Sequence, residues 1–324
     1  MMPSEIEENC GMASEPKLGW SKSEDSRRMG QEAIQSMIER FQEDALRAIL
    51  KNTRIEDLDD GYFWGMALAW AASNTESHGC LRALIEAGVK IDAPIDDGYT
   101  ALSRSADADN AAAIHALCDL GANHSVREEC GRTPLLLAAN SGNEAAIEAL
   151  VKRGAAVAVK DMSAKSPVDL LLSAAEWQAK PQQRESCARS LVILLKAGAR
   201  STRIANMSLM AQIAVVGNPA MITGALDAGA VGVDDASESG LTALMCCARS
   251  ELFPSESCVS VLLMLGARTD LVDARGLTAL DYAVQADNLG IAQRIRETAA
   301  AREALALGQA VETPRLPQAR RPTL

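Results

Sequence analysis

Aromatic side chains are scarce in this sequence: Phe, Trp and Tyr together fill 10 of the 324 positions, whereas alanine fills 57. A core built on large rings is therefore excluded, and the composition predicts helices that pack closely through small side chains. Histidine is equally scarce, with 3 residues, which leaves few candidates for a general base or a metal ligand. Hydrophobic residues make up 48% of the chain, enough to bury a core and to exclude a disordered chain.

Cysteine pairs at CxxC spacing, long apolar runs and an excess of positive charge are also absent. The eight cysteines are scattered, and we interpret them as reduced thiols, mostly small core residues. No apolar run reaches the roughly 18 residues that span a bilayer, and the N-terminal region lacks the apolar stretch of a secretory signal. We therefore expect a soluble, cytoplasmic protein. The formal charge of −11 argues against a nucleic-acid or membrane partner and favours a protein partner with a basic or neutral surface.

A Gly-small pair after a leucine-rich stretch repeats along the chain. Its first two intervals are 33 residues, and later intervals of 44, 31 and 37 indicate insertions. A glycine at the end of a helix supplies the left-handed backbone that caps the C-terminus. A period of this length predicts a solenoid of stacked repeats. The glycines of this first mark are Gly88, Gly121, Gly154, Gly198, Gly229 and Gly266.

A second mark, Gly-x-Thr-small-Leu, follows most copies of the first mark after 10 residues. Its glycine supplies a turn, and the Thr hydroxyl is expected to cap the next helix. Pro134 and Pro167 fall at the first helical position, where a missing N–H is harmless. Each repeat is therefore predicted to place a tight turn before a helix. The clearest copies begin at Gly98, Gly131, Gly240 and Gly276.

Together these features resemble ankyrin repeats. The resemblance rests on the Gly-x-Thr-Pro-Leu start, the Ala138-Ala139 pair, the Gly142-Asn143 that follows, the Leu-Leu-x-x-Gly-Ala end and the 33-residue period. It implies an all-α repeat solenoid of helix-turn-helix repeats with projecting β-hairpin loops. About seven copies are expected over residues 61–301, and the first and fifth depart most from the pattern.

Three further segments are expected around the repeats. Residues 1–28 are polar and predicted to be disordered. Residues 29–60 carry apolar residues at helical spacing and are predicted to form the helical N-terminal cap that an open repeat stack needs. Residues 302–324 are expected to hold the helix end and a Pro/Arg tail. Within the repeats, an insertion at 174–190 is interpreted as a loop that either forms a second contact site or covers neighbouring helix ends.

Motifs that carry chemistry are missing. The sequence has no Gly-x-Ser-x-Gly elbow, no Walker phosphate loop and no Gly-x-Gly-x-x-Gly after a strand. We therefore expect no enzymatic activity, no cofactor and no metal. One alternative is an enzyme or zinc protein, built on the inserted fourth repeat or on His115, Cys118, His124 and Cys130.

Recognition by a surface is the function that remains. The resemblance implies a non-catalytic, monomeric adaptor, scaffold or inhibitor that binds a partner protein through hairpin tips and a concave face. An alternative is a bacterial effector that is delivered into a host cell and binds a host protein with the same repeats. The N-terminal hairpins combine aromatic anchors with acids, which suits a basic partner. The alternative is that the aromatics only close the core against the N-terminal cap. The predicted partner-binding residues are Tyr62, Phe63, Trp64, Asp96, Asp97, Tyr99, Glu128, Glu129, Arg132, Asp161, Lys165 and Trp177.

Overall fold

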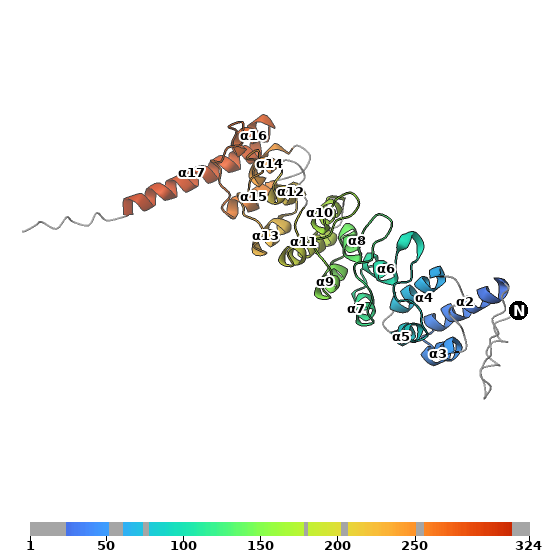
Figure 1. Ribbon diagram of the computed structural model, residues 1–324. Coiled ribbons are helices and arrows are strands. Elements are labelled where there is room, and N and C mark those ends of the chain that lie inside the picture. Colours follow the sequence, from blue (N-terminus) through green and yellow to red (C-terminus); the bar gives the residue numbers. More distant parts are fainter. Residues whose placement is uncertain are drawn as a thin grey trace, which may run out of the picture. The chain divides into compact units, whose positions relative to one another are not determined.

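The computed structural model describes residues 24–51, 61–73, 78–177, 181–201, 207–250 and 256–312. Over these residues the chain forms 16 α-helices and one short 3₁₀ helix, and no strand. It divides into two compact units: unit 1 is Met1–Ala174 with Ala197–Arg200, and unit 2 is Ala175–Lys196 with Ser201–Leu324. The predicted all-α repeat solenoid is confirmed, because helix pairs follow one another within each unit (Figure 1).

Unit 1 has two layers of helices. The first helices of successive pairs pack side by side, α4 on α6 and α6 on α8, and the second helices do the same, α3 on α5 and α7 on α9. At the N-terminal end, α2 packs on α4, so α2 and α3 cover the first repeat. The elements are α2 (Glu24–Glu39), α3 (Glu43–Lys51), α4 (Gly61–Ser73), α5 (His78–Glu86), η4 (Asp96–Gly98), α6 (Ala101–Asp107), α7 (Ala111–Asp119), α8 (Pro134–Ser141), α9 (Glu144–Lys152) and α10 (Pro167–Trp177).

Unit 2 repeats this arrangement. Its first helices α12, α14 and α16 pack in succession, as do its second helices α11, α13, α15 and α17. Arg302 on α17 donates to the carbonyl oxygens of Leu263 and Ala267 at 2.7 and 2.6 Å, which satisfies the C-terminal end of α15. The elements are α11 (Pro181–Lys196), α12 (Leu209–Val215), α13 (Pro219–Asp227), α14 (Ala243–Arg249), α15 (Glu256–Met264), α16 (Ala279–Gln285) and α17 (Leu289–Glu312).

The two sequence marks form the helix ends that they predict. The Thr133 hydroxyl accepts the N–H of Leu136 at 3.5 Å, and Pro134 opens α8. All six glycines of the first mark have positive φ, as C-terminal caps of this kind require. Hydroxyl caps recur at Thr100, Ser208, Thr242 and Thr278.

Asparagine side chains connect neighbouring helix pairs. Asn143, before α9, donates to the carbonyl oxygens of Ala106 and Asp107 at 3.0 and 2.7 Å. Asn288, before α17, bonds the end of α14 in the same way. Each bond satisfies carbonyl groups that a helix leaves open at its C-terminus. The Gly-Asn that follows the Ala-Ala pair in the sequence therefore contributes to stacking.

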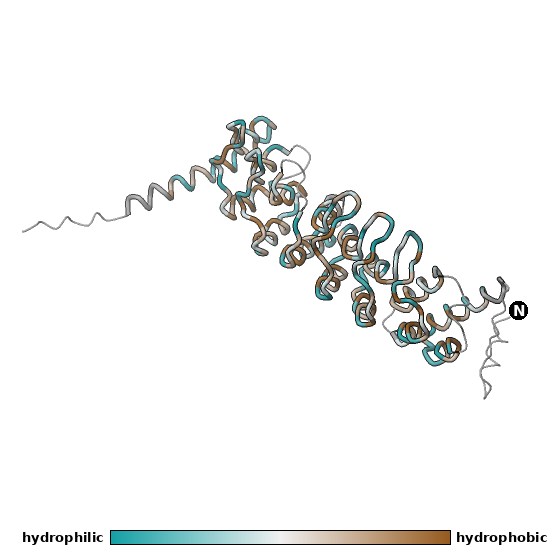
Figure 2. The backbone as a smooth tube through the Cα atoms, viewed as in Figure 1, coloured by the Kyte–Doolittle hydropathy of each residue, from teal (hydrophilic) through white to brown (hydrophobic). Residues whose placement is uncertain are grey.

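The core is made of leucine, isoleucine and alanine rather than rings. Ala138 and Ala139 are fully buried on α8, and Leu136 beside them is also fully buried. Small side chains at these positions let neighbouring helices approach closely. The loops that join successive pairs of unit 1 are largely hydrophilic (Figure 2).

Some segment boundaries differ from the sequence expectation. Helix α2 begins at Glu24, inside the segment 1–28 that was expected to be disordered, and residues 1–23 lie outside the described residues. Helix α17 continues to Glu312, into the segment 302–324. The stretch 174–190 is not an inserted loop where it is described, because α10 continues to Trp177 and α11 starts at Pro181. Its good helix formers, with Pro181 at the first helical position, extend the two helices instead.

Candidate functional site

Three loops of unit 1 form a row, which we call the loop row: residues 95–99, 128–132 and 161–165. The first and last residues of each loop are joined by a backbone hydrogen bond, such as Glu128 N–H to Arg132 O at 3.1 Å. Neighbouring loops are joined as well, by Glu129 N–H to Asp97 O at 3.0 Å and by Met162 N–H to Cys130 O at 3.2 Å. These bonds resemble the expected hairpins, although none of the described residues is assigned to a strand. The row is therefore held by backbone bonds within and between loops.

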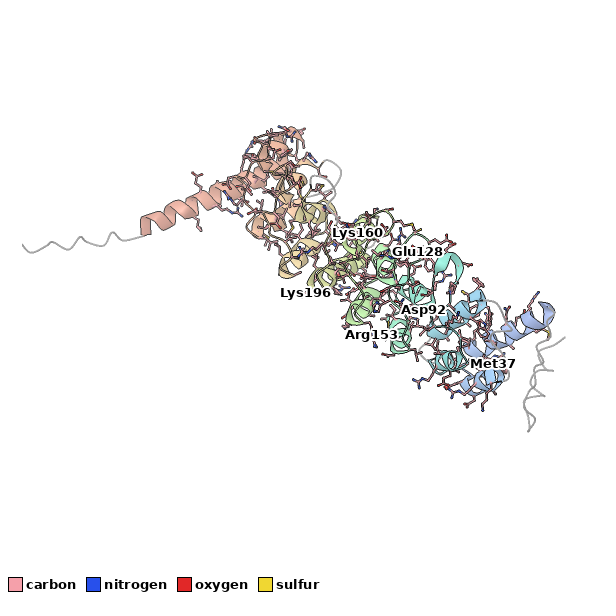
Figure 3. The ribbon with its side chains drawn as sticks, in the orientation of Figure 1. Met37, Asp92, Glu128, Arg153, Lys160 and Lys196 are labelled. Carbon is pink, nitrogen blue, oxygen red and sulfur yellow. The ribbon has the colours of Figure 1, made fainter. Side chains whose placement is uncertain are left out.

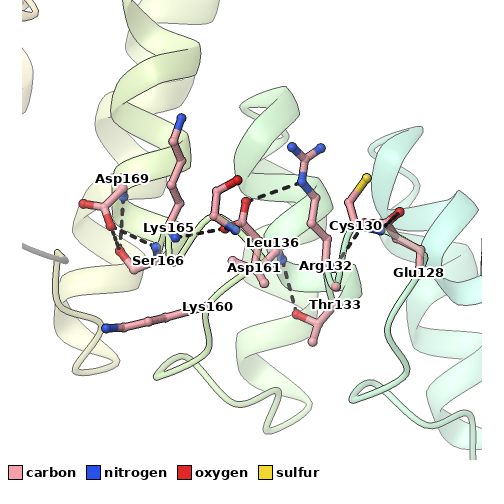
Figure 4. Close-up of polar contacts among 12 residues, drawn as sticks. Glu128, Cys130, Arg132, Thr133, Leu136, Lys160, Asp161, Lys165, Ser166 and Asp169 are labelled. Carbon is pink, nitrogen blue, oxygen red and sulfur yellow. Dashed lines mark hydrogen bonds and ion pairs between the residues drawn. The ribbon is translucent and has the colours of Figure 1, made fainter.

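Two of the predicted acidic residues close their own turns. The carboxylate of Glu128 accepts the N–H groups of Cys130 and Arg132 at 2.9 and 3.1 Å, and Glu128 is 7% exposed. Asp161 accepts the N–H groups of Ser163 and Lys165, both at 2.9 Å. Figure 4 shows both carboxylates bonded within their own loops. Their charges fix loop geometry, in the manner of Asx turns.

Other acidic residues of the row face solvent. Asp96, Asp97 and Glu129 are exposed, and none of them forms an ion pair with another described residue. Asp97 has a φ of 55°, a left-handed conformation that Asp tolerates better than most residues. The exposed tip of the first two loops is therefore acidic.

The second and third loops each end in a cationic residue. Lys165 is exposed, and the half-buried Arg132 lies 3.8 Å from the Asp161 carboxylate. In Figure 4 the Lys165 ammonium and the Arg132 guanidinium point to the same side of the loops. The first loop thus carries two acids, whereas in the third loop Lys165 balances the charge of Asp161.

Tyr99 is the aromatic residue of the loop row. It is half-buried, and the Arg104 guanidinium lies 5.8 Å from its ring centroid. Burial, followed by the nearby carboxylates Asp107 and Glu128, raises the pKa of its phenol. Tyr99 therefore presents a neutral ring edge beside the acidic tip.

The aromatic residues at the start of the first repeat do not lie on a hairpin, so their placement there is wrong, whereas the burial of Phe63 and Trp64 fits the alternative that these aromatics close the core against the cap. Tyr62, Phe63 and Trp64 start helix α4, where Phe63 and Trp64 are 7% and 4% exposed. Their rings meet edge to face at 5.1 Å, and Phe63 also contacts Trp70 at 6.4 Å. Tyr62 is 48% exposed. Of the three, two therefore belong to the core beneath α2.

The remaining predicted positions do not form a site with the loop row. The side chain of Trp177 lies outside the described part of the structure. His115 accepts a hydrogen bond from Arg153 at 3.0 Å, and Figure 3 shows Arg153 on the side of unit 1 away from Glu128. Cys130 is exposed on its loop. Among the described residues, no group of three or more His, Cys, Asp or Glu side chains is placed to hold a metal ion.

The described cysteines are mostly buried. No disulfide bond joins any two of the seven described cysteines. Burial raises the pKa of the Cys258 thiol to about 11 and that of Cys247 further still. Across the described ranges, no helix combines the length and apolar character needed to cross a membrane.

Unit 2 has a polar network that sequence reasoning did not identify. Asp273 accepts the Tyr282 hydroxyl at 2.6 Å and the Arg275 side chain at 3.2 Å, and its second oxygen accepts two turn N–H groups, from Arg275 and Leu277. Arg275 also donates to the Tyr282 hydroxyl. Tyr282 is 2% exposed. The sequence signal for this network is an acidic residue three positions before the turn glycine, as with Asp273 and Gly276. Neither of the two repeat marks includes this position.

We expect the contribution of Asp273 to stability to depend on pH. Its pKa is lowered to about 2 from an ordinary value of 3.8, because the Tyr282 hydroxyl and then the Leu277 N–H donate to the carboxylate. A lowered pKa in the folded state stabilises the fold above the ordinary pKa, and this stabilisation is lost as the pH falls from about 4 to about 2. Urea unfolding measures the gap between the free energies of unfolding of the wild type and Asp273→Asn. This gap should narrow as the pH falls over this range. A gap that stays constant down to pH about 2.5 contradicts the assignment.

The comparisons with known proteins agree with this fold. Residues 68–161 match the family model for ankyrin repeats, three copies. The chain therefore carries ankyrin repeats, as its sequence marks predict, and repeats of this kind are generally protein–protein interaction modules. No curated protein sequence matches the chain.

Solved structures of similar fold come from human and bacterial proteins. The human ASB11 ankyrin repeat domain is 22% identical with a TM-score of 0.53, over 71% of this chain and 96% of that chain. An ankyrin repeat domain from Acinetobacter baumannii AYE is 25% identical with a TM-score of 0.49, over 61% and 97%. A chain in the complex of a predatory endopeptidase from Bdellovibrio bacteriovorus with its immunity protein is 21% identical with a TM-score of 0.46, over 60% and 96%. The first of these likenesses supports the fold of this chain.

Proposed function

We propose that the chain is a non-catalytic binding module that holds a partner protein at the loop row of unit 1. The observation that supports this most is the difference between the acids of the row. Glu128 and Asp161 bond the turns, whereas Asp96, Asp97 and Glu129 are exposed without an ion pair among the described residues. Charges that the fold does not use are available to a partner.

The row suits recognition because its loops are ordered before binding. Backbone bonds join each loop to the next, so little conformational entropy is lost when a partner binds. The acidic tip attracts a basic segment and raises the association rate, while the Tyr99 ring supplies an apolar contact beside it. The partner we propose is a protein with a basic patch that contacts Asp96, Asp97 and Glu129.

The proposal also covers the oligomeric state of the chain and its cellular compartment. A chain whose described thiols are all reduced is suited to a reducing compartment. We propose a cytoplasmic monomer that acts as an adaptor, scaffold or inhibitor. In each of these roles, affinity for a partner is the whole activity.

Removing the acidic charges of the tip is expected to remove the partner. The variant Asp96→Asn, Asp97→Asn and Glu129→Gln keeps side-chain size, and asparagine tolerates the left-handed backbone at position 97. Partners captured from a lysate by the wild type and identified by mass spectrometry should bind the variant roughly tenfold more weakly. Their binding to the wild type should weaken as salt rises.

A variant of equal charge change serves as the control. Asp44 is exposed on α3, and Asp227 and Glu303 are exposed on helices of unit 2. Asp44→Asn, Asp227→Asn and Glu303→Gln should retain the partner, and both variants should unfold within about 0.5 kcal/mol of the wild type. Equal retention of the partner by both variants would show that the loop row is not the interface.

A further inference from the structure

Unit 2 holds a cavity of about 430 Å³ between two neighbouring loops. Its apolar wall comes from Met207 and Leu241, and its polar wall from Arg249, Asp273 and Tyr282, with Arg275 at the rim. A backbone hydrogen bond from Ala274 N–H to Ser239 O at 2.8 Å joins the two loops. This bond holds the two sides of the cavity beside each other in the folded protein.

The polar wall is fixed by the Asp273 network. Asp273 accepts hydrogen bonds on both carboxylate oxygens, and its side chain is 3% exposed. Arg275 forms an ion pair with it at 3.2 Å. The positive charge of Arg275 is therefore balanced by Asp273, and the Tyr282 ring is held in place by its hydroxyl group.

The charge of Arg249 is not balanced by a carboxylate among the described residues. Its guanidinium lies 5.9 Å from the Tyr282 ring centroid, and the Arg275 guanidinium lies 5.4 Å from the same centroid. Within the described ranges, no carboxylate forms an ion pair with Arg249. A guanidinium presents its N–H groups in a planar fork that matches the two oxygens of a carboxylate. The cavity thus has one unbalanced positive charge.

We propose that this cavity binds a carboxylate of a partner protein, held by Arg249 and flanked by an apolar contact on Met207 and Leu241. The proposal rests on the proposed function, since it names the chemistry of a partner segment at a second place on the chain. A single carboxylate matches the single unbalanced charge, whereas a phosphate group would bring about two negative charges. The carboxylate belongs to an Asp or Glu side chain or to a chain terminus, and the experiment separates these.

Random synthetic peptides with free carboxyl termini provide the test. The immobilised full chain selects peptides, and mass spectrometry identifies them. We expect enrichment of Asp and Glu next to an apolar residue, and at least roughly tenfold weaker binding of these peptides to Arg249→Glu. Arg249→Lys should recover part of the affinity, because it keeps the charge but loses the fork. Replacing the acidic residue of a selected peptide with Gln should abolish binding if a side-chain carboxylate is bound. Amidating the peptide C-terminus should abolish binding if the terminal carboxylate is bound.

The control variant reverses a charge elsewhere in unit 2. Arg296 is exposed on α17 and does not line the cavity, so Arg296→Glu should select the same acidic peptides as the wild type. The proposal is overturned if changing the peptide acids to Gln and amidating the terminus together leave binding unchanged, if Arg249→Glu and Arg296→Glu retain the peptides equally, or if phosphoserine peptides bind more tightly than their Glu counterparts. Failure of the proposed function is a separate result, because it is measured by the binding of captured proteins to the variant of the acidic tip in unit 1.

Discussion

Replacing Trp64 with alanine is expected to lower the free energy of unfolding by about 3–5 kcal/mol. The ring is 4% exposed, meets Phe63 at 5.1 Å and lies in α4, which packs on both α2 and α6. Its removal leaves a cavity at the point where the N-terminal helix pair covers the first repeat. Urea unfolding followed by circular dichroism measures the loss, and hydrogen exchange should show α2 and α4 opening first.

Tyr62→Ala is the matched control for this prediction. Tyr62 starts the same helix but is 48% exposed, so its truncation should cost less than about 1 kcal/mol. Similar losses for the two variants would contradict the assignment of Trp64 to the core. A binding defect caused by Trp64→Ala would accordingly report lost folding, which is why Trp64 is absent from the variant that tests the loop row.

Gly240→Ala is expected to destabilise unit 2 by about 2–4 kcal/mol. Gly240 has a φ of 78°, and a Cβ atom there would lie 3.0 Å from the Asp273 Cα and 3.3 Å from the Val272 carbonyl oxygen. The substitution therefore strains the turn and pushes the next loop away. Chemical unfolding with circular dichroism measures the effect.

Gly276→Ala separates the two causes. Gly276 occupies the same place in the last loop, with a φ of 77°, but a Cβ atom there meets nothing within 4 Å. This variant should lose only the cost of the left-handed backbone, about 1–2 kcal/mol. Equal losses at both glycines would mean that the close approach of neighbouring loops adds no strain.

Much of the fold was predictable because its signals are local. Thr133 caps α8, Pro134 starts it and Gly154 ends the following helix, and each of these functions depends on residues within one turn. The repeats then follow from the period. The start of α4 was not predictable in this way, because the stretch Gly61 to Trp64 lacks the Gly-x-Thr mark and its aromatics fit a hairpin tip as well as a core.

The site was predictable only in part, since the same residue type performs two tasks. Glu128 and Glu129 are adjacent in the sequence, yet Glu128 accepts the turn N–H groups and Glu129 faces solvent. The position three residues before the turn glycine, which Glu128 shares with Asp273, was the available signal. Arg249 gave no signal, because its partner ring, Tyr282, comes from the next repeat.

The closure of each turn by one inward side chain has a consequence for how such a chain changes over evolutionary time. Because Glu128 and Asp161 hold their loops, the neighbouring tip positions contribute almost nothing to folding. Substitutions at Glu129 or Ser163 can therefore accumulate without loss of stability. A lineage carrying this chain is free to exchange one binding partner for another while its helices stay unchanged.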